Sequence, residues 1–331
     1  MHNNLFSQII SLDNLFVSWC EFRKGKRKKY DVQLFERNLE DNLFELHTDL
    51  KNKTYHHSNY TSFYITDPKQ RHIHKAEVRD RIVHHAVYRV LYPIFDKTFI
   101  FDSYSCRSKK GTHKAVDRLE YFTRKVSQNY TKPCFALKCD IKKFFDSVDH
   151  QPLFNLIKKK IHDKQVLWLI SEIISSFRIR ERERESKTYS AIGIPIGNLT
   201  SQLFANIYLN EIDQFVKHQL KIKYYLRYCD DFVIIDNSDK ALENLIPIIQ
   251  NFLGSSLKLE LHEQKIIIRK LKQGIDFLGY VVLPHYRVLR TKTKRRMLKR
   301  INRKNLPSYL GLLKHCSGYK LKEEIIRRVE F

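Results

Sequence analysis

The stretch YCDDFVII (residues 228–235) places two adjacent carboxylates, Asp230 and Asp231, in an otherwise apolar run. The longer segment YYLRYCDDFVIID indicates two short strands joined by a turn at the two acids. Adjacent carboxylates repel one another, so keeping both ionised requires a nearby cation. An Asp-Asp pair by itself is also an ordinary turn signal, and only its context can decide between the two interpretations.

A third carboxylate ends another apolar segment. In CFALKCDIKKFF (134–145) the pattern predicts a short strand that ends at Asp140 and is followed by a polar turn and an aromatic pair. Neighbouring strands could bring Asp140 to the same sheet edge as Asp230 and Asp231. Phosphoryl transfer by two divalent cations uses ions about 3.5–4 Å apart. The three acids therefore predict a site for divalent metal.

The charge balance indicates a polyanionic partner. Lys and Arg number 61 against 36 Asp and Glu, a formal net charge of +25 in 331 residues. Such a surface repels itself unless a polyanion is nearby, and nucleic acid is the leading candidate. An anionic membrane surface is the competing interpretation, but the sequence has no apolar run of 18 residues, and its start, MHNNLFSQII, does not resemble a signal peptide. We expect a soluble, cytoplasmic protein with no membrane partner.

Cysteines and paired histidines do not indicate a zinc site. The six cysteines are scattered without C-x-x-C spacing, which favours reduced thiols over a zinc site or a disulfide framework. The paired histidines have no Cys or carboxylate at zinc spacing, so we expect them to be hydrogen-bonded or to face RNA. These pairs are His56 and His57, His72 and His74, and His84 and His85.

Alternating strand and helix patterns predict an α+β protein with a mainly antiparallel sheet. The first 54 residues have a helical pattern, and a hairpin that turns at Asp67-Pro68 follows. One long helical stretch is expected over residues 153–174, and strands over 258–270 and 275–283. The chain from Pro284 onward is basic and is expected to be helical.

Four motifs occur in the order found in reverse transcriptases. YCDD matches their Tyr-x-Asp-Asp box, CDIKKFFDSVDH resembles their first carboxylate motif, GIPIGNLTSQLFANIYLNEID resembles the loop and helix between the two, and IDFLGYVV resembles the strand that grips the primer. The segment RDRIVHHAVYRVLYPIFDKTFIFDSYSCRSKKGTH, the pair Ser201-Gln202 and SYLGLLKHC are similar to the reverse transcriptases of diversity-generating retroelements, relatives of the group II intron type. The resemblance covers roughly residues 55–320.

This resemblance implies a right-hand polymerase fold of fingers, palm and short helical thumb. The N-terminal helical extension would cover residues 1–54 and the fingers 55–130. The palm would cover 131–283, with a helical insertion around 151–192, and the thumb 284–331.

The resemblance also assigns roles around the metals. Asp140 and Asp230 would be the principal ligands of two Mg²⁺ ions, for which Mn²⁺ is a substitute, while Asp231 would support the site. The backbone carbonyl of Ile141 would complete one metal's shell. Lys265 corresponds to the lysine thought to protonate departing pyrophosphate, although a plain surface lysine on a strand is the alternative.

Other residues would select and bind the nucleotide. Phe145 would lie beneath the sugar and exclude a ribose 2′-hydroxyl, and an ordinary core aromatic is the alternative. Lys69 and Arg71 of the fingers hairpin would bind the triphosphate, because arginine offers a planar fork and lysine a point charge to phosphate. Arg81 and Arg107 are secondary candidates, and a solvated basic hairpin is the alternative.

The loop GIPIGN departs from the wider family at Ile196, where glutamine is common. Losing a polar contact that checks base-pair geometry should reduce discrimination. The resemblance therefore implies low fidelity, with misincorporation opposite template adenine. Gln202, where other relatives often have proline, supports the narrower assignment. Ile196 and Gln202 complete the nucleotide-binding set that the resemblance implies.

The remaining site residues would bind primer and template. The primer grip would comprise Phe277, Leu278, Gly279 and Tyr280. A basic thumb helix would follow the phosphates through cations that include Arg295, Arg296, Lys299 and Arg300. A plain solvated face is the alternative.

The predicted function is an RNA-directed DNA polymerase that makes error-prone cDNA from the template-repeat RNA of a prokaryotic or phage retroelement. Its partners would be template RNA, DNA primer and cDNA, deoxynucleoside triphosphates, and a small basic accessory protein that forms an oligomeric barrel. Another bacterial reverse transcriptase, defence-associated or group II intron-like, is the nearest alternative. A non-catalytic RNA-binding scaffold is the alternative outside enzymes, and the three intact acids argue against it.

Overall fold

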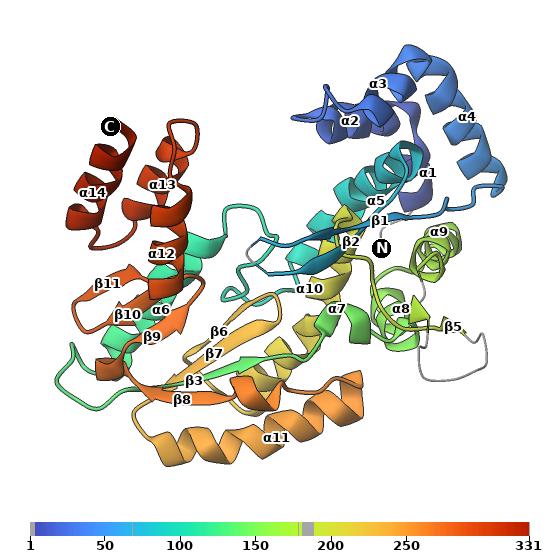
Figure 1. The fold of residues 1–331 in the computed structure, drawn as a ribbon. Helices are drawn as coiled ribbons and strands as arrows, with labels where there is room; N and C mark the ends of the chain where they lie inside the picture. Colours follow the sequence, from blue (N-terminus) through green and yellow to red (C-terminus); the bar gives the residue numbers. More distant parts are fainter. Residues whose placement is uncertain (1–3, 68, 178, 181–188, 331) are drawn as a thin grey trace. The chain divides into compact units, whose positions relative to one another are not determined.

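A computed structural model describes residues 4–67, 69–177, 179–180 and 189–330 (Figure 1). The chain divides into two compact units. Unit 1 contains Met1–Ile100, Lys142–Ile212 and Leu253–Leu259, and unit 2 contains Phe101–Ile141, Asp213–Phe252 and Glu260–Phe331. Each unit therefore draws on segments far apart in the sequence.

Unit 1 is mostly helical. Its helices are α1 (Leu5–Ile10), α2 (Leu12–Arg23), α3 (Tyr30–Arg37), α4 (Leu39–Asn52), α5 (Val78–Asp96), α7 (Phe144–Ser147), α8 (His150–Lys158), α9 (Lys164–Ser175) and most of α10 (Leu199–Gln214). The first four helices confirm the helical pattern of the first 54 residues, and their buried side chains pack partly against α5.

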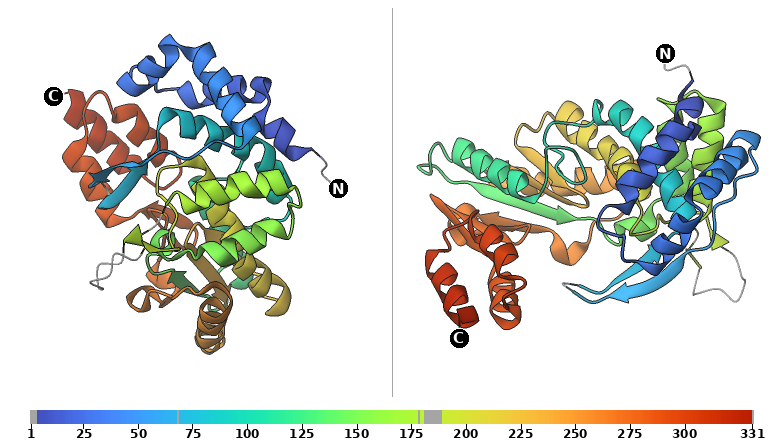
Figure 2. Two further views of the ribbon diagram at one scale, coloured as in Figure 1. Left: turned by 90° about the vertical axis from the view of Figure 1, so that its right-hand side faces the viewer. Right: turned by 90° about the horizontal axis from the view of Figure 1, so that it is seen from above.

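Two hairpins complete unit 1. Strands β1 (Thr61–Ile65) and β2 (Arg71–Lys75) form the expected antiparallel hairpin, which extends away from the helices of the unit (Figure 2). Pro68, where a turn was expected, lies outside the described residues. Strands β4 (Ile179–Arg180) and β5 (Tyr189–Ser190) pair with each other, and residues 181–188 between them also lie outside the described residues.

The helical stretch expected over residues 153–174 is two helices, so that expectation was wrong. Helix α8 ends at Lys158 and α9 begins at Lys164. Asp163 caps the second helix, because its Oδ1 accepts hydrogen bonds from the backbone N–H groups of Gln165 and Val166 at 3.0 and 3.3 Å. This N-cap chemistry stabilises a new helix start that apolar periodicity alone does not reveal.

Unit 2 is built on a four-stranded antiparallel sheet in the order β6-β7-β3-β8. Helix α6 (Thr112–Val126) and the part of helix α11 (Asp239–Leu257) that belongs to unit 2 lie on opposite faces of this sheet (Figure 1). The α6 face buries an apolar core that includes Leu119, Phe122, Ala136 and Val233. The strands are β3 (Phe135–Asp140), β6 (Tyr225–Tyr228), β7 (Asp231–Asp236) and β8 (Ile267–Lys270).

A second sheet and three helices follow in unit 2. The sheet has the order β11-β10-β9, and then come α12 (Thr291–Arg300), α13 (Leu306–Leu313) and α14 (Tyr319–Glu330). The three strands are β9 (Ile275–Phe277), β10 (Tyr280–Leu283) and β11 (Tyr286–Leu289). Short irregular helices also occur: η1 (Phe215–Gln219), η2 (Glu263–Lys265) and η3 (Leu271–Gln273).

Three expectations about this region were wrong in detail. Residues 275–283 form a hairpin rather than one strand, because Leu278 and Gly279 adopt positive φ angles of 49° and 92°. Of residues 258–270, only the last four form a strand. The segment after Pro284 begins with strand β11 before it becomes helical.

In the described part of the chain, every helix is too short or too polar to span a lipid bilayer. All six cysteines are free, and Cys134 and Cys139 are buried in unit 2.

Candidate active site

Asp140 and Asp231 lie directly opposite each other across the β3–β7 pair. Asp140 is the last residue of β3 and Asp231 is the first of β7. Opposed residues of an antiparallel pair have side chains on the same face, with Cβ atoms about 4.5–5.5 Å apart. Lys138 shares that face by alternation along the strand, and its Nζ lies 3.7 Å from Asp231 Oδ1. The two acids thus meet at one sheet edge, as the sequence analysis expected.

Asp230 occupies the turn between β6 and β7. Because Tyr228 pairs with Asp231, the turn contains only Cys229 and Asp230, so one acid lies in the turn and the other begins a strand. Cys229 has a φ of 56°, which a type II′ hairpin turn requires at its first central residue. The Asp230 carbonyl accepts a hydrogen bond from the Ile141 N–H at 3.3 Å, which joins the turn to the end of β3.

The electrostatics of this turn favour a bound cation. Burial raises the pKa of the Asp230 carboxyl, and the negative charge of Asp140 raises it further. The two carboxylates are therefore close enough to repel each other, and a cation between them would relieve that repulsion.

Lys265 brings a positive charge to the same edge. It ends the 3₁₀ turn η2 rather than lying on a strand, and its Nζ is 2.7 Å from Asp140 Oδ1. The Asp140 carbonyl accepts a hydrogen bond from the His262 N–H at 2.8 Å, which holds η2 beside the end of β3. Lys265 is thus in contact with a predicted metal ligand, whereas the alternative was a plain surface lysine on a strand.

The donor set suits a hard divalent cation, since Mg²⁺ prefers carboxylate and carbonyl oxygens. Asp140, Asp230 and Asp231 offer carboxylates, and Ile141 offers a backbone carbonyl beside them. Among the residues that the structure describes, no three candidate side chains converge into a ready-made metal cage. The Lys265 ammonium holds one oxygen of Asp140 in that arrangement, and a bound cation would compete with it.

Arg227 and Asp213 form a buried ion pair that the sequence analysis missed. Both side chains have zero exposure. Arg227 Nε and Nη2 donate to the two oxygens of Asp213 at 2.8 and 2.7 Å, and Nη1 donates to the Cys229 carbonyl at 3.1 Å. Tyr225 Oη also donates to Asp213, at 2.7 Å. The pair thereby fixes the turn that carries Asp230. The available signal was a lone arginine inside the apolar strand YLRY.

Several predicted nucleotide-binding residues lie together in unit 1. The Phe145 carbonyl accepts a hydrogen bond from the Ile194 N–H at 2.8 Å, which attaches the residue to the loop 193–198. The Ile196 carbonyl accepts from the His74 N–H at 3.0 Å, and Asn198 Nδ2 donates to the His74 carbonyl at 3.1 Å. The loop therefore continues alongside β2, and it joins the hairpin to Phe145.

The loop approaches β2 closely at Gly197. This glycine has a φ of 120°, and a Cβ placed on it would lie 3.0 Å from Ile73 Cγ2. Asn198 is buried, and its Oδ1 has no hydrogen-bond partner among the described residues. Sequence reasoning did not single out Asn198, whose side chain tethers the loop.

The other predicted nucleotide-binding residues of unit 1 differ in their surroundings. Arg71 begins β2, and Lys69 precedes it in the exposed hairpin connection. Gln202 is exposed on α10. Arg81, a secondary candidate, donates instead to Asp31 at 2.6 Å, so its guanidinium contributes to packing within unit 1.

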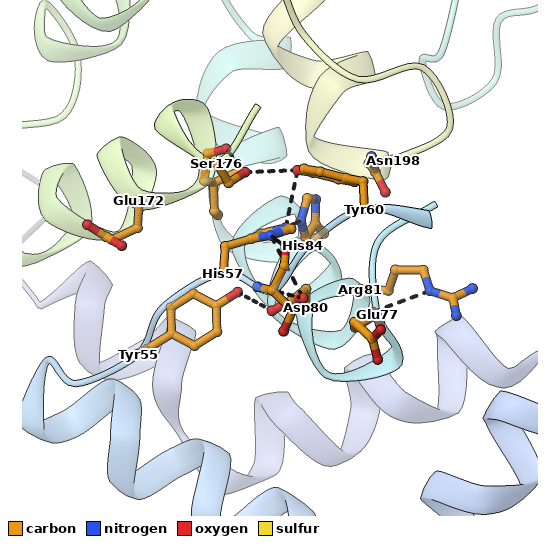
Figure 3. A network of polar contacts seen from close by, with 12 residues as sticks. Tyr55, His57, Tyr60, Glu77, Asp80, Arg81, His84, Glu172, Ser176 and Asn198 are labelled. Carbon is orange, nitrogen blue, oxygen red and sulfur yellow. Dashed lines mark hydrogen bonds and ion pairs between the residues drawn. The ribbon is translucent and has the colours of Figure 1, made fainter. Parts of the chain in front are cut away.

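A buried polar network links α5 to the segment that precedes β1 (Figure 3). Asp80 of α5 accepts a hydrogen bond from Tyr55 Oη at 2.8 Å. His57 Nε2 and His84 Nε2 are 3.0 Å apart, and His84 Nδ1 is 2.6 Å from Thr200 Oγ1. Burial holds the pKa of His84 well below its ordinary value, and the charge of His57 adds to this. These histidines are hydrogen-bonded, and the network joins the segment before β1 to α5 and α10.

The predicted primer grip is divided between core and turn. Phe277 and Tyr280 are buried in unit 2, while Leu278 and Gly279 form the turn of the β9–β10 hairpin. Tyr280 Oη donates to the Leu312 carbonyl at 3.1 Å, which anchors α13 to the sheet. Contact with a primer is therefore expected from the turn rather than from the two rings.

Helix α12 has a basic face toward solvent and an apolar face toward α13 and α14. Met297 is fully buried against α13 and α14. The predicted phosphate-binding residues of this helix surround its solvent side: Arg295, Arg296, Lys299 and Arg300.

Comparison with known proteins identifies the family that these features match. The family described as "Reverse transcriptase (RNA-dependent DNA polymerase)" matches residues 65–282, about two thirds of the chain. That range contains all three aspartates, Lys265 and the β9–β10 turn.

Curated relatives include proteins of group II introns. The chain is 26% identical over 340 residues to the group II intron-encoded protein LtrA of Lactococcus lactis subsp. cremoris, an alignment that covers 83% of this chain and 54% of the relative. It is 26% identical over 235 residues to the protein YkfC of Escherichia coli, which covers 61% of this chain and 60% of YkfC. The chain thus spans 54% and 60% of the length of these two relatives.

Solved structures with a similar fold include telomerases. Apo telomerase from Candida tropicalis matches with a TM-score of 0.55 and 14% identity, over 81% of this chain and 56% of that one. Telomerase from Candida albicans in complex with a fragment of telomeric RNA matches with a TM-score of 0.53 and 12% identity, over 78% and 51%. At these identities the likeness shows the fold, the α+β fold of reverse transcriptases.

Proposed function

The chain belongs to the reverse transcriptase family, and we propose that it is an RNA-directed DNA polymerase that extends a DNA primer along an RNA template. One observation carries the proposal: Asp140 lies opposite Asp231 at the strand ends, with Asp230 in the adjoining turn. A module that only bound RNA would gain nothing from three acids gathered in a chain of net charge +25.

In this proposal Asp140 and Asp230 are the principal metal ligands, Asp231 supports them, and the Ile141 carbonyl completes one shell. Two Mg²⁺ ions bound there would stabilise the charge on the attacking and leaving oxygens. Lys265, whose Nζ lies 2.7 Å from Asp140 Oδ1, would give a proton to the departing pyrophosphate. General acid assistance of this kind contributes about 10²- to 10⁴-fold in other enzymes.

Unit 1 would select the nucleotide. Phe145 would exclude a ribose 2′-hydroxyl, and its hydrogen bond to the loop 193–198 holds it in register with Ile196. Lys69 and Arg71 would bind the triphosphate. Gln202 completes the predicted set, and its position on α10 places it after the same loop.

Unit 2 would hold the primer and template. The turn at Leu278 and Gly279 would contact the primer strand, and the cations of α12 would follow the phosphates. Binding by such cations weakens as salt increases, because counterions are released from the nucleic acid.

Primer extension with an annealed DNA primer on an RNA template, Mg²⁺ and deoxynucleotides tests the activity. Asp230→Asn removes a charge at nearly constant volume and should abolish extension. Asp41→Asn, a matched change at an exposed position of α4, should leave it unchanged. Equal extension by wild type and Asp230→Asn would falsify the catalytic assignment.

We further propose that the chain is the mutagenic polymerase of a diversity-generating retroelement, acting in the cytoplasm of a prokaryote or phage host with a small basic accessory protein. Support comes from Ile196 in the loop and from Gln202 after Ser201. Sequencing of the cDNA should show errors concentrated opposite template adenine. Ile196→Gln, which restores a polar contact, should reduce them.

A group II intron-like reverse transcriptase is the second candidate, because the alignment with LtrA extends over 83% of this chain. The same cDNA sequencing separates the two. Errors opposite adenine no more frequent than at other template bases would favour the group II intron-like function.

A further inference from the structure

Unit 2 carries an open hollow of about 440 Å³ beside the first half of α6. Its walls come from the loop that precedes the helix and from one face of the helix itself. We name its main residues the α6 patch: Phe101, Lys109, Lys110, Lys114, Arg118 and Tyr121. Neither the metal site nor the proposed nucleotide and primer contacts include any of these residues.

Two aromatic rings of the patch are open to solvent. Phe101 is 66% exposed and Tyr121 is 47% exposed. Cations lie against both rings: Lys110 Nζ is 3.4 Å from the centroid of Phe101, and the Arg118 guanidinium carbon is 5.1 Å from that of Tyr121. The hollow therefore brings two exposed rings and the cations beside them onto one surface.

Three of the four cations of the patch are held in place by contacts within the protein. Lys110 Nζ donates to the Phe101 carbonyl and Lys114 Nζ to the Lys109 carbonyl, both at 2.7 Å. Arg118 Nε donates to Asp102 at 2.8 Å. These contacts position the ammonium groups of Lys110 and Lys114 at the wall of the hollow.

The charge of the hollow selects an anion. Four cations and one carboxylate, Asp117, line it, and Asp117 itself is paired with Arg287 at 2.6 Å. Single-stranded nucleic acid binds to surfaces that combine a cationic track for phosphates with aromatic rings on which bases stack. An acidic peptide would satisfy the cations but would leave the two exposed rings unused.

We propose that the α6 patch binds a single-stranded segment of RNA, with bases stacked on Phe101 and Tyr121 and phosphates against Lys109, Lys110 and Lys114. This binding requires neither metal nor nucleotide. It would hold the RNA at a second place on unit 2, in addition to the site of synthesis.

The test measures the affinity of the full chain for a labelled 12-nucleotide single-stranded RNA in EDTA. Phe101→Ala should weaken binding at least about five-fold, the lower end for loss of one stacked base, and Phe101→Trp should retain it. Lys109→Glu should lower the slope of log affinity against log salt by about 0.7 for each phosphate that the variant no longer neutralises. Lys240→Glu makes the same charge change at an exposed position of α11 and should leave the slope nearly unchanged.

Three outcomes would overturn the proposal. In the first, Phe101→Ala and Lys109→Glu bind this RNA as wild type does, while circular dichroism shows that both are folded. In the second, a DNA of the same sequence binds more tightly and depends on Phe101, which assigns the patch to DNA. In the third, polyglutamate binding depends on Lys109 while RNA binding does not, which assigns it to an acidic protein.

A second measurement locates the contact directly. Ultraviolet crosslinking of a 5-bromouracil-containing RNA should modify Phe101 or Tyr121, and crosslinks confined to other residues would contradict the assignment. Extension of a short, saturating primer–template should stay within about two-fold of wild type in Phe101→Ala. The binding result stands apart from the proposed polymerase activity, which Asp230→Asn tests separately.

Discussion

The turn that carries Asp230 is supported by the buried Arg227–Asp213 pair, and we expect Arg227→Met to be severely destabilising. Arg227 makes two hydrogen bonds to the Asp213 carboxylate, one to the Cys229 carbonyl and one to Ser103 Oγ. Both charged groups have zero exposure, so water cannot take the place of the missing guanidinium.

The expected magnitude follows from this burial. Removing one partner of a buried ion pair costs about 3–5 kcal/mol, because it leaves an uncompensated buried charge. Asp213 would keep the hydrogen bond from the Tyr225 hydroxyl, which carries no positive charge. Since domains are stable by about 5–15 kcal/mol, this loss would remove a large share of the stability of unit 2.

The double variant Arg227→Met with Asp213→Leu separates stability from positioning. It removes both charges, so most of the stability should return, as it does when buried ion pairs are replaced by apolar residues. The Cys229 carbonyl would still lack its donor. We therefore expect the double variant to fold but to extend primers with a lower kcat and a nearly unchanged KM for the primer–template.

Urea denaturation followed by far-ultraviolet circular dichroism measures the first effect. Tryptophan fluorescence is unsuitable, because Trp19 and Trp168 both lie in unit 1. Hydrogen exchange of the peptide 225–236 reports on the β6–β7 hairpin itself. A cost below about 1 kcal/mol for Arg227→Met, with unchanged exchange in that peptide, would refute the reasoning.

Three further predictions concern unit 1. Phe145→Ala should raise the ratio of ribonucleotide to deoxyribonucleotide incorporation by about tenfold or more, since removing one group from a binding pocket changes selectivity by about 10- to 200-fold. Single-nucleotide extension measures this ratio, and an unchanged ratio would show that Phe145 is not the sugar filter. Because burial lowers the pKa of His84, the unfolded chain binds a proton that the folded chain excludes, so stability should fall as pH drops below about 6.5. His84→Gln should reduce the pH dependence of the free energy of unfolding by up to about 1.4 kcal/mol per pH unit. Denaturation at a series of pH values measures this, and an equal pH dependence in both proteins would contradict it. Gly197→Ala should destabilise by about 1–3 kcal/mol, because its φ is 120° and the new Cβ would press on β2. The control Gly254→Ala lies in a helix with open space around it and should stabilise slightly. Equal denaturation midpoints for the two variants would count against a close approach of the loop.

The sequence indicated the strand ends and the acids at them, because those signals are local. An apolar run that ends at Asp140 and a second interrupted by Asp230 and Asp231 already indicate two strands with carboxylates at their ends. The order of the motifs then favoured one family, and the comparisons support it. Position along a strand determines which face of the sheet a side chain takes. Once β3 and β7 pair in the observed register, Asp140 therefore lies opposite Asp231, as expected.

Tertiary structure decided what depends on partners distant in sequence. Asp213 is fourteen positions from Arg227, on a helix, and no local pattern shows that the two pair beneath the turn. The hydrogen bonds that bracket His74 join it to residues more than 120 positions away. The helix break at Asp163 and the turn at Leu278 depend on cap and backbone geometry that apolar periodicity does not encode. The sequence by itself therefore determined which residues could do the chemistry, whereas long-range packing determined which side chains hold them in place.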